Sequence, residues 1–426
     1  MTSQELNKRI TDSANLLKQK KYQDALDLLK ELLSVYPNNM GVINNLALAY
    51  KNLGNYSQAR SIFLKILDME KDLNQSNVYT NAGNLFFSMG ELEKCIEASK
   101  IALECDNKNV SALANMGLSY NEQGNSDEAI SCFKRALEIE PKNDIINYHL
   151  ANIYRVLMEY KKAINHYDLT NQRLAKSNQL ECIYKDNNRK LFNEKLNLLS
   201  KNDALQPLVA SLSAHAAIRY EQEDAYPFCK NPMDLIHSID LFEDERFNEQ
   251  LISNLGDEIN QSGLSKKTQS LLDKGVQSSG NLFLQDLPNI KLIQEIIKDN
   301  IDKYRDKFSN QEALFIKSWP QLWGLHGWLI IMQQGGSLLG HMHKEGWLSG
   351  SIYLKIPKKN LPNEGDIKFS LNGGAYPYDK ETFPEKIINI KRGSMVMFPS
   401  SLFHSTIPFH SNEERITLAF DVIPKH

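Results

Sequence analysis

The sequence predicts two domains of different class, an α-helical array of repeated units followed by an antiparallel β-sandwich or barrel. A residue pattern recurs every 34 or 36 positions through the first 172 residues. After about Pro227, short apolar runs of strand length alternate with turns. Six of the ten histidines lie in the last hundred or so residues, where strands and loops are expected. We therefore expect the chemistry to reside in the second half.

The overall composition excludes several functions. The chain has 426 residues, enough for several domains, and its net charge of −3 offers no basic excess for nucleic acid or an anionic membrane surface. The amino-terminal residues are polar and no apolar run is long enough to cross a bilayer, so we expect neither a secretory signal nor a membrane span. The five cysteines include no CxxC pair. They indicate structural thiols in a reducing compartment and predict a cytoplasmic protein.

The repeated pattern is marked by small residues at fixed spacing. One series occupies the start of the second helix of each unit, at Ala25, Ala59, Cys95, Ala129 and Ala163. A second series lies twelve residues earlier, at Ala47, Gly83, Gly117 and Ala151. Glycines lie five residues before three members of the first series, at Gly54, Gly90 and Gly124. The pattern predicts antiparallel helix pairs that approach closely at the small residues, turn at the glycines and stack to bury a shared core.

These units resemble the tetratricopeptide repeat. Five units fit residues 5–172, so we assign residues 1–172 to this array. Residues 173–231 lose the period but keep helical spacing, for example in Lys190–Leu199. Because a solenoid needs a terminal cap, we interpret 173–231 as a helical cap and connector.

One polar position recurs within the repeats. Asn45, Asn81 and Asn115 each precede a small residue of the first helix by two positions. If this position faces the concave surface, the carboxamides form a ladder that pairs with the peptide units of a bound polypeptide. Such a ladder is similar to the one in the peptide-binding arrays of O-linked glycosyltransferases. The alternative is that these side chains pack or cap locally.

The residues 232–426 form the predicted second domain. A helix is expected from Met233 to Ile259, with a strand near its start at 237–242, and another from Leu287 to Phe308. The stretch between them, 264–283, is polar and rich in Gly and Ser. Strands are expected in six later segments, namely Gly327–Met332, Ser349–Ile356, Gly365–Phe369, Ile387–Ile390, Ser394–Phe398 and Arg415–Val422.

Three histidines within this domain form a candidate metal site. His341 and His343 follow a Gly-rich turn and are two residues apart, so on one strand they point to the same face. His404 follows the predicted strand at 394–398. Neutral imidazoles suit first-row divalent metals, and three of them would leave coordination positions open.

Arg415 and Thr417 are expected on one face of the last strand. A buried guanidinium requires an anion and matches a carboxylate in two-point contact, to which the threonine hydroxyl can add a bond. The alternative is a surface salt bridge with Glu413 or Glu414.

Three strings carry a resemblance to a known family. They are HMHKEGWLSG at 341–350, FPSSLFH at 398–404 and ERITLAFD at 414–421. The second domain resembles the 2OG-Fe(II) oxygenases that are often fused behind tetratricopeptide repeats. The resemblance implies a double-stranded β-helix, or jelly roll, with flanking helices. It also implies Fe(II) held by His341, His343 and His404, 2-oxoglutarate held by Arg415, and O2 as the oxidant.

The ligand set departs from the wider superfamily, which carries a carboxylate where His343 stands. Three alternatives follow. His343 is the third ligand, or His343 contacts the cosubstrate instead, or Glu345 supplies the carboxylate. Trp347, Ser349 and Tyr353 are further candidates for the wall of the pocket, with core packing as the competing role for the two aromatic residues.

The sequence therefore predicts an Fe(II)- and 2-oxoglutarate-dependent dioxygenase that hydroxylates a side chain of a protein or peptide presented by the repeats. One alternative is a three-histidine dioxygenase of the cupin type that does not use 2-oxoglutarate. The other is a non-catalytic repeat scaffold with a degenerate β-domain. The sequence does not identify the substrate.

Overall fold

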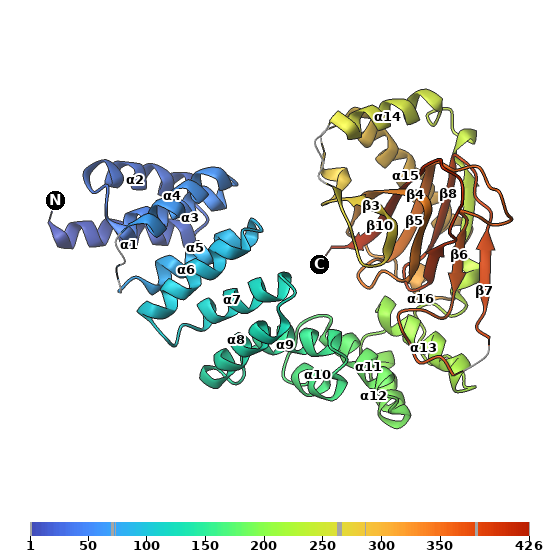
Figure 1. The fold of residues 1–426 in the computed structure, drawn as a ribbon, viewed down its shortest axis with the longest axis horizontal. Coiled ribbons are helices and arrows are strands. Elements are labelled where there is room, and N and C mark those ends of the chain that lie inside the picture. The colour runs from blue at the N-terminus through green and yellow to red at the C-terminus, as the bar shows by residue number, and fades with distance from the viewer. Residues whose placement is uncertain are drawn as a thin grey trace. The chain divides into compact units, whose positions relative to one another are not determined.

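The computed structural model describes residues 2–69, 72, 74–261, 266–285, 287–379 and 382–425. The chain divides into two compact units, Met1–Lys176 and Ser177–His426. Within the described residues the first unit is built from helices, and the second combines helices with a β-sheet (Figure 1). This arrangement confirms the predicted fold class. The boundaries at 172 and 231 stay predictions.

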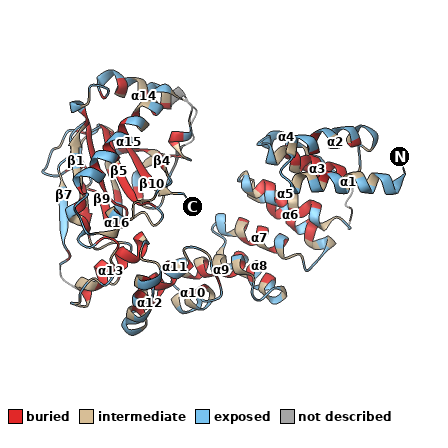
Figure 2. Ribbon diagram, turned by 180° about the vertical axis from the view of Figure 1, so that it is seen from behind, coloured by how far each residue is buried: buried red, intermediate tan, exposed pale blue. Residues whose placement is uncertain are grey.

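The first unit is an array of antiparallel helix pairs, as the repeat period predicts. Its helices are α1 Ser3–Lys18, α2 Tyr22–Val35, α3 Met40–Asn52, α4 Tyr56–Asp68, α5 Ser76–Ser88, α6 Leu92–Cys105, α7 Val110–Glu122, α8 Ser126–Ile139, α9 Asp144–Val156 and α10 Tyr160–Tyr167. Buried residues follow the facing sides of these helices (Figure 2). Apolar residues at helical spacing therefore form the core of the array.

The small residues lie where the helices approach most closely. A Cβ added to Gly117 would lie 2.8 Å from the ring of Phe133, which leaves no room for a larger residue. The three turn glycines Gly54, Gly90 and Gly124 have φ of +80°, +75° and +82°. A left-handed backbone of this kind favours glycine and ends the first helix of the pair.

Two of the three recurring asparagines pack within the array rather than lining its surface. Asn45 is 8% exposed, and its amide donates to the Ser13 hydroxyl at 3.0 Å. Asn115 is 5% exposed and donates to the carbonyl of Thr80 at 3.4 Å. Both amides satisfy polar groups of a preceding helix, because a buried carboxamide needs partners. For these two residues the local-packing alternative describes the structure.

Asn81 is half-buried, and its amide donates to the side-chain oxygen of Asn44 at 2.9 Å. It thus joins the first helices of two neighbouring repeats. A continuous ladder of three free carboxamides is not present in the described residues, because each of the three already has a partner within the array.

Three further helices lead into the β-domain. They are α11 Ala175–Lys185, α12 Arg189–Asn202 and α13 Pro207–Arg219. Helix α13 is anchored to a long loop of the β-domain, since the His215 ring lies 3.0 Å from the Asn372 oxygen and Arg219 Nε donates to Asp379 at 2.8 Å. Residues from Ser177 onward therefore belong to the same compact unit as the sheet.

The sheet has ten strands in antiparallel order β1-β8-β5-β10-β4-β9-β6-β7, with β3 joined to β4 and β2 joined to β3. The strands are β1 His237–Asp240, β2 Lys266–Lys267, β3 Leu272–Ser278, β4 Trp323–His341, β5 Leu348–Lys355, β6 Ile367–Ser370, β7 Glu385–Ile388, β8 Ser394–Pro399, β9 Phe403–Thr406 and β10 Arg415–Pro424. The sheet curls until it is nearly closed into a barrel, which is the predicted jelly-roll architecture.

Helices flank the sheet. They are η1 Pro232–Leu235, η2 Leu241–Glu243, α14 Glu249–Gln261, η3 Leu282–Leu284, α15 Pro288–Lys307 and α16 Leu314–Lys317. Helix α15 lies across the outer face of the sheet in both Figure 1 and Figure 2, with a buried row of isoleucines. The predicted helix at 233–259 is wrong in its first half, where η1, β1 and η2 lie instead. In the polar stretch 264–283, residues 264 and 265 lie outside the described residues, and β3 follows.

The Gly-rich segment before His341 is not a turn between strands. Strand β4 runs through it, and Gly335 has φ of +75°. Up to Met332 the strand pairs with β10, and from Leu338 it pairs with β9. The glycines therefore let one long strand bend from one side of the barrel to the other.

Candidate metal and 2-oxoglutarate site

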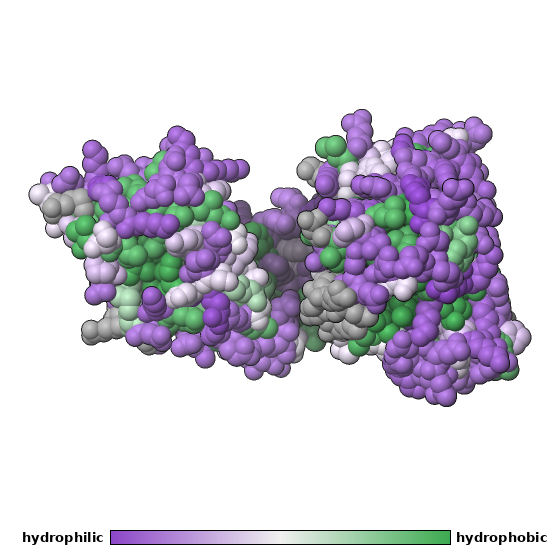
Figure 3. All heavy atoms as spheres, turned by 90° about the horizontal axis from the view of Figure 1, so that it is seen from above, coloured by the Kyte–Doolittle hydropathy of each residue, from purple (hydrophilic) through white to green (hydrophobic). Residues whose placement is uncertain are grey.

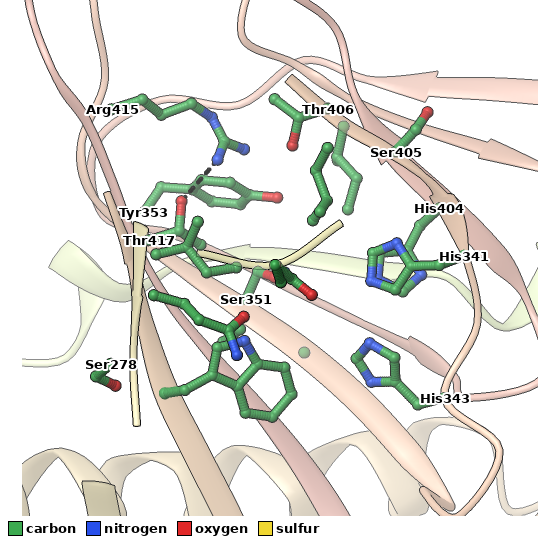
Figure 4. A pocket seen from close by; sticks show the side chains of 18 of the residues that line it. Ser278, His341, His343, Ser351, Tyr353, His404, Ser405, Thr406, Arg415 and Thr417 are labelled. Atoms are coloured by element: carbon green, nitrogen blue, oxygen red, sulfur yellow. Dashed lines mark hydrogen bonds between the residues drawn. The ribbon is translucent and has the colours of Figure 1, made fainter. Parts of the chain in front are cut away.

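A cavity of about 430 Å³ lies within the β-domain. Side chains from β3, β4, β5, β9 and β10 line it (Figure 4). The three histidines lie together along one side of the cavity, and Arg415 and Thr417 lie at another. The cavity therefore brings together the two halves of the predicted site.

The structure places the histidines differently from the predicted single strand face. His341 is the last residue of β4 and pairs in register with His404 of β9. His343 follows in the loop before β5, where its backbone N–H donates to the carbonyl of Ser400 at 3.1 Å. The HxH pair converges because the loop turns His343 back over the sheet.

The three imidazoles form one compact group. The ring centroids of His341 and His404 are 4.3 Å apart. The centroid of His343 lies 5.2 Å from that of His341 and 5.0 Å from that of His404. One nitrogen from each of the three lies within 4.8 Å of the others. Three nitrogen donors at this separation can face a single cation.

Each ring has an oxygen acceptor beside Nδ1. His341 Nδ1 lies 2.8 Å from the carbonyl of Leu339, and His404 Nδ1 lies 3.3 Å from that of Leu402. His343 Nδ1 lies 2.6 Å from Asp421 Oδ1. Because an oxygen acceptor requires a hydrogen on Nδ1, the lone pair of each ring is on Nε2.

Burial also keeps two of the three rings, those of His341 and His404, neutral. Burial, aided by the nearby His343, lowers the pKa of His341 to about 4. Burial lowers the pKa of His404 well below its usual range, and its two histidine neighbours act in the same direction. Both side chains therefore offer an unprotonated nitrogen at neutral pH, as metal binding requires.

Glu345 is exposed and is not part of the cluster, so the alternative in which it supplies a carboxylate ligand does not fit the structure. The loop carries this side chain to the surface, whereas Gly346 and Trp347 turn inward. The described residues present no carboxylate to complete the group of three rings.

Arg415 is 3% exposed and lies over the ring of Tyr353, 5.0 Å from its centroid. Its Nε donates to the carbonyl of Gly365 at 3.0 Å, and Nη1 donates to the Thr417 hydroxyl at 2.8 Å. Glu414 pairs instead with Lys355, so the predicted alternative of a surface salt bridge to this residue is wrong.

Within the described residues, no carboxylate lies at ion-pair distance from the Arg415 guanidinium. Burial lowers the pKa of this guanidinium. A buried charge without a counter-charge is costly, so the site favours an anion from solution.

Of the three further candidates for the pocket wall, Tyr353 lines the cavity. Trp347 does not. It is buried in the core, where its indole N–H donates to the carbonyl of Phe315 at 2.9 Å and its ring lies against Phe228. Ser349 also lies outside the lining, because its hydroxyl is directed to Asp421 at 2.7 Å.

The family comparison covers this site. Residues 326–421 match the family model described as "Putative 2OG-Fe(II) oxygenase". Residues 16–85 and 110–143 match models of the tetratricopeptide repeat. The chain joins tetratricopeptide repeats to a domain of this oxygenase family. All three histidines and Arg415 lie within the matched segment of the oxygenase domain.

The chain is also similar to parts of several known proteins. The chain is 24% identical over 219 residues to TPR repeat-containing protein MJ1428 of Methanocaldococcus jannaschii, covering 39% of this chain and 38% of that protein. It is 30% identical over 129 residues to protein O-mannosyl-transferase TMTC3 of Homo sapiens, covering 30% of this chain and 14% of that protein. The chain thus spans well under two thirds of the length of either relative. Pseudomonas aeruginosa pilF aligns with a TM-score of 0.40 at 16% identity, over 52% of this chain and 94% of that chain.

Sequence reasoning missed two features of the oxygenase domain. Trp328 lines the cavity with its ring 5.5 Å from that of His343, and His326 and Ile330 line it as well. The signal was the alternation of these three residues along β4, which puts them on one face. Asp421 was also missed, because a residue 78 positions from His343 gives no local signal.

None of the five cysteines, all of which the structure describes, forms a disulfide. Among the described helices, none combines the length and apolar character that a membrane crossing requires.

Proposed function

We propose that the second unit is an Fe(II)- and 2-oxoglutarate-dependent dioxygenase and that it hydroxylates a side chain of a protein or peptide. The observation that carries this proposal is one cavity with two complementary ends. Three imidazoles gather at one end, and a buried arginine without a carboxylate partner among the described residues lies at the other.

The residues fit a divalent iron ion. His341, His343 and His404 would hold it through Nε2, since imidazole is a suitable ligand for Fe(II). When bound, the iron supplies the activation of O2 that couples the conversion of 2-oxoglutarate to succinate and CO2 with hydroxylation of a C–H bond. The chain itself holds the nitrogen donors in place, anchors the cosubstrate and provides a cavity that limits access of water.

Arg415 and Thr417 are suited to the distal carboxylate of 2-oxoglutarate. The guanidinium is already oriented by Gly365 and Thr417, and the Tyr353 ring supports its face. Orientation before binding reduces the entropy that binding must overcome. A dicarboxylate can therefore lie between the arginine and the three rings.

The rest of the cavity suits a neutral target. Apart from Arg415 and the histidines, its described lining carries no ionisable group other than Tyr353. Trp328 offers a flat aromatic surface beside His343, and Gln269 and Gln277 offer carboxamides. A carboxamide can both donate to and accept from a peptide unit, which agrees with a polypeptide substrate.

The repeats are proposed to bind a polypeptide partner. On the face of the first unit seen in Figure 3, apolar side chains gather between polar ones. Exposed apolar groups of this kind are typical of surfaces that bind proteins. The similar TMTC3 is named as a transferase that acts on proteins. The lack of a disulfide among the five cysteines agrees with a reducing compartment, and we propose the cytoplasm.

The first experiment is anaerobic titration of the metal-free, full-length protein with Fe(II), with and without 2-oxoglutarate, followed by an assay for succinate. His404→Ala should abolish Fe(II) binding, whereas His410→Ala, at an exposed site outside the cavity, should not. Binding of iron without 2-oxoglutarate turnover would instead support the three-histidine dioxygenase. Binding of neither would contradict the enzyme proposal.

The substrate is sought by incubating the loaded enzyme with a cell lysate and comparing peptide masses. A gain of one oxygen atom on a protein side chain, absent with His404→Ala, is the expected result. Succinate formation with oxygen incorporated only into small molecules would contradict the polypeptide part of the proposal.

A further inference from the structure

Asp421 is a buried carboxylate directly behind one of the three rings. It lies on β10, which places it opposite His326 of β4 on one side and Ser349 of β5 on the other. Its side chain is 10% exposed. The sheet therefore fixes it by hydrogen-bonded strands on both sides.

Two donors converge on one oxygen of this carboxylate. His343 Nδ1 donates to Asp421 Oδ1 at 2.6 Å, and the Ser349 hydroxyl donates to the same atom at 2.7 Å. The Ser349 oxygen in turn lies 2.7 Å from the hydroxyl of Ser400. The His343 ring is thus held in one tautomer and one orientation by a chain of polar groups.

The loop that carries His343 packs closely on this chain of groups. A Cβ added to Gly346 would lie 2.6 Å from Ser400 Oγ and 3.3 Å from Asp421 Cγ. Only glycine allows the loop to come this near. The position of His343 and that of the carboxylate behind it are therefore set together.

The described residues offer the Asp421 carboxylate no lysine or arginine partner. Among the described residues, no lysine or arginine lies at ion-pair distance from it, and its ion-pair neighbour is the His343 ring alone. Burying a carboxylate without a full positive charge beside it costs free energy. A divalent cation on the other nitrogen of His343 would provide the missing positive charge.

In a centre of two histidines and one carboxylate, the bound carboxylate supplies negative charge to the metal. We infer that Asp421 supplies this charge here, through His343, an inference that rests on the proposed function. Hydrogen bonding to a carboxylate makes the opposite nitrogen a stronger donor. A metal bound at that nitrogen would thereby receive part of the negative charge of Asp421. His343 and Asp421 together then replace the carboxylate ligand that the sequence lacks, and Asp421 is a positioning residue.

The test measures metal affinity and reduction potential, not turnover. Metal-free, full-length wild-type protein and Asp421→Asn are titrated anaerobically with Fe(II) and with Co(II), whose absorption spectrum reports the ligand field. Asp421→Asn keeps an oxygen acceptor but removes the charge. We expect its dissociation constants to rise by about 10- to 100-fold. We also expect its Fe(III)/Fe(II) potential to rise, because lost negative charge disfavours the ferric state.

Asp240→Asn is the matched control, because Asp240 is an aspartate of the same sheet that pairs with Lys391 outside the cavity. It should leave both quantities unchanged. A second test is a double-mutant cycle with His343→Asp, which restores a directly bound carboxylate. In that background Asp421→Asn should no longer weaken metal binding. An equal loss in both backgrounds would indicate a merely structural role and overturn the inference.

The inference is also overturned if Asp421→Asn binds metal as wild type does with an unchanged potential. If Asp421→Asn does not fold, Asp421→Glu and Ser349→Ala replace it, since both keep the carboxylate. Both should keep the wild-type potential, and a raised potential in either contradicts the inference. Metal binding by wild type without a 2-oxoglutarate response would sink only the proposed function. No metal binding by wild type would overturn both.

Discussion

Replacing Arg415 with methionine separates cosubstrate binding from folding. The guanidinium is almost wholly buried and donates to the carbonyl of Gly365 at 3.0 Å and to Thr417 at 2.8 Å. It also lies 5.0 Å from the centroid of the Tyr353 ring. Methionine fills a similar volume without the charge.

The effect on stability should be small because two contributions oppose each other. Two hydrogen bonds from a charged donor contribute about 3–6 kcal/mol. Against this, removal of the buried charge recovers a desolvation penalty of several kcal/mol, so similar replacements are often near neutral. We expect the free energy of unfolding of metal-free Arg415→Met to lie within about 2 kcal/mol of wild type.

The effect on 2-oxoglutarate should be large. Truncating one partner of a buried, hydrogen-bonded charge pair costs about 2–5 kcal/mol. Since 1.36 kcal/mol is tenfold, the dissociation constant for 2-oxoglutarate should rise at least about 30-fold. Affinity for the metal alone should not change, because Arg415 does not contact the three rings.

Urea unfolding of the metal-free protein and anaerobic calorimetry with Co(II) and 2-oxoglutarate measure the two effects. Arg392→Met is the control, since Arg392 donates to the carbonyl of Leu354 and pairs with Glu249 outside the cavity. Wild-type affinity of Arg415→Met for 2-oxoglutarate would refute the reasoning. So would a loss of affinity that merely accompanies extensive unfolding.

Two further predictions concern stability. Burial lowers the pKa of His215 to about 4, so the folded state holds this ring neutral. The unfolded chain takes up a proton on this ring near pH 6.5, whereas the folded protein does so only near pH 4. The stability that comes with the neutral ring is therefore fully present above about pH 6.5 and is lost as the pH falls to about 4. Urea unfolding at pH 7 and pH 4 should show a loss of up to about 3 kcal/mol in wild type relative to His215→Gln. Separately, Asn115→Ala should destabilise the repeats by about 1 kcal/mol because its buried amide bonds to a preceding helix, whereas the half-buried Asn81→Ala should cost less; equal losses on chemical denaturation would contradict this.

The repeats could be predicted closely because their signal is local. Small residues such as Gly117 recur wherever two helices approach, and turn glycines such as Gly124 recur where a left-handed backbone is needed. The six later strands predicted from short apolar runs each overlap a strand of the sheet, for a similar reason. Strands β2, β3 and β9 were not predicted. The path of β4 was not predicted either, because Gly335 bends a continuous strand, whereas the same residues in sequence suggest a turn.

The candidate site was likewise predictable from the sequence only in part. Its residue types and spacing, two histidines at 341 and 343, a third at 404 and an arginine at 415, were enough to predict a metal and a carboxylate in one place. The spacing did not distinguish wall from core, and only the structure shows Trp347 in the core and Ser349 outside the cavity lining. Side-chain direction there depends on strands that are far apart in sequence.

By itself, the sequence determined the two fold classes, the helix pairs and the identity of the groups that meet in the cavity, because each depends on periodicity or on residue chemistry. Only the tertiary structure decided that Asn45 and Asn115 hold helices together, that Glu345 stays outside the cluster, and that Asp421 lies behind His343. The physical reason is that a buried polar group takes its partner from whichever strand or helix packs against it, and that choice is made in space rather than along the chain.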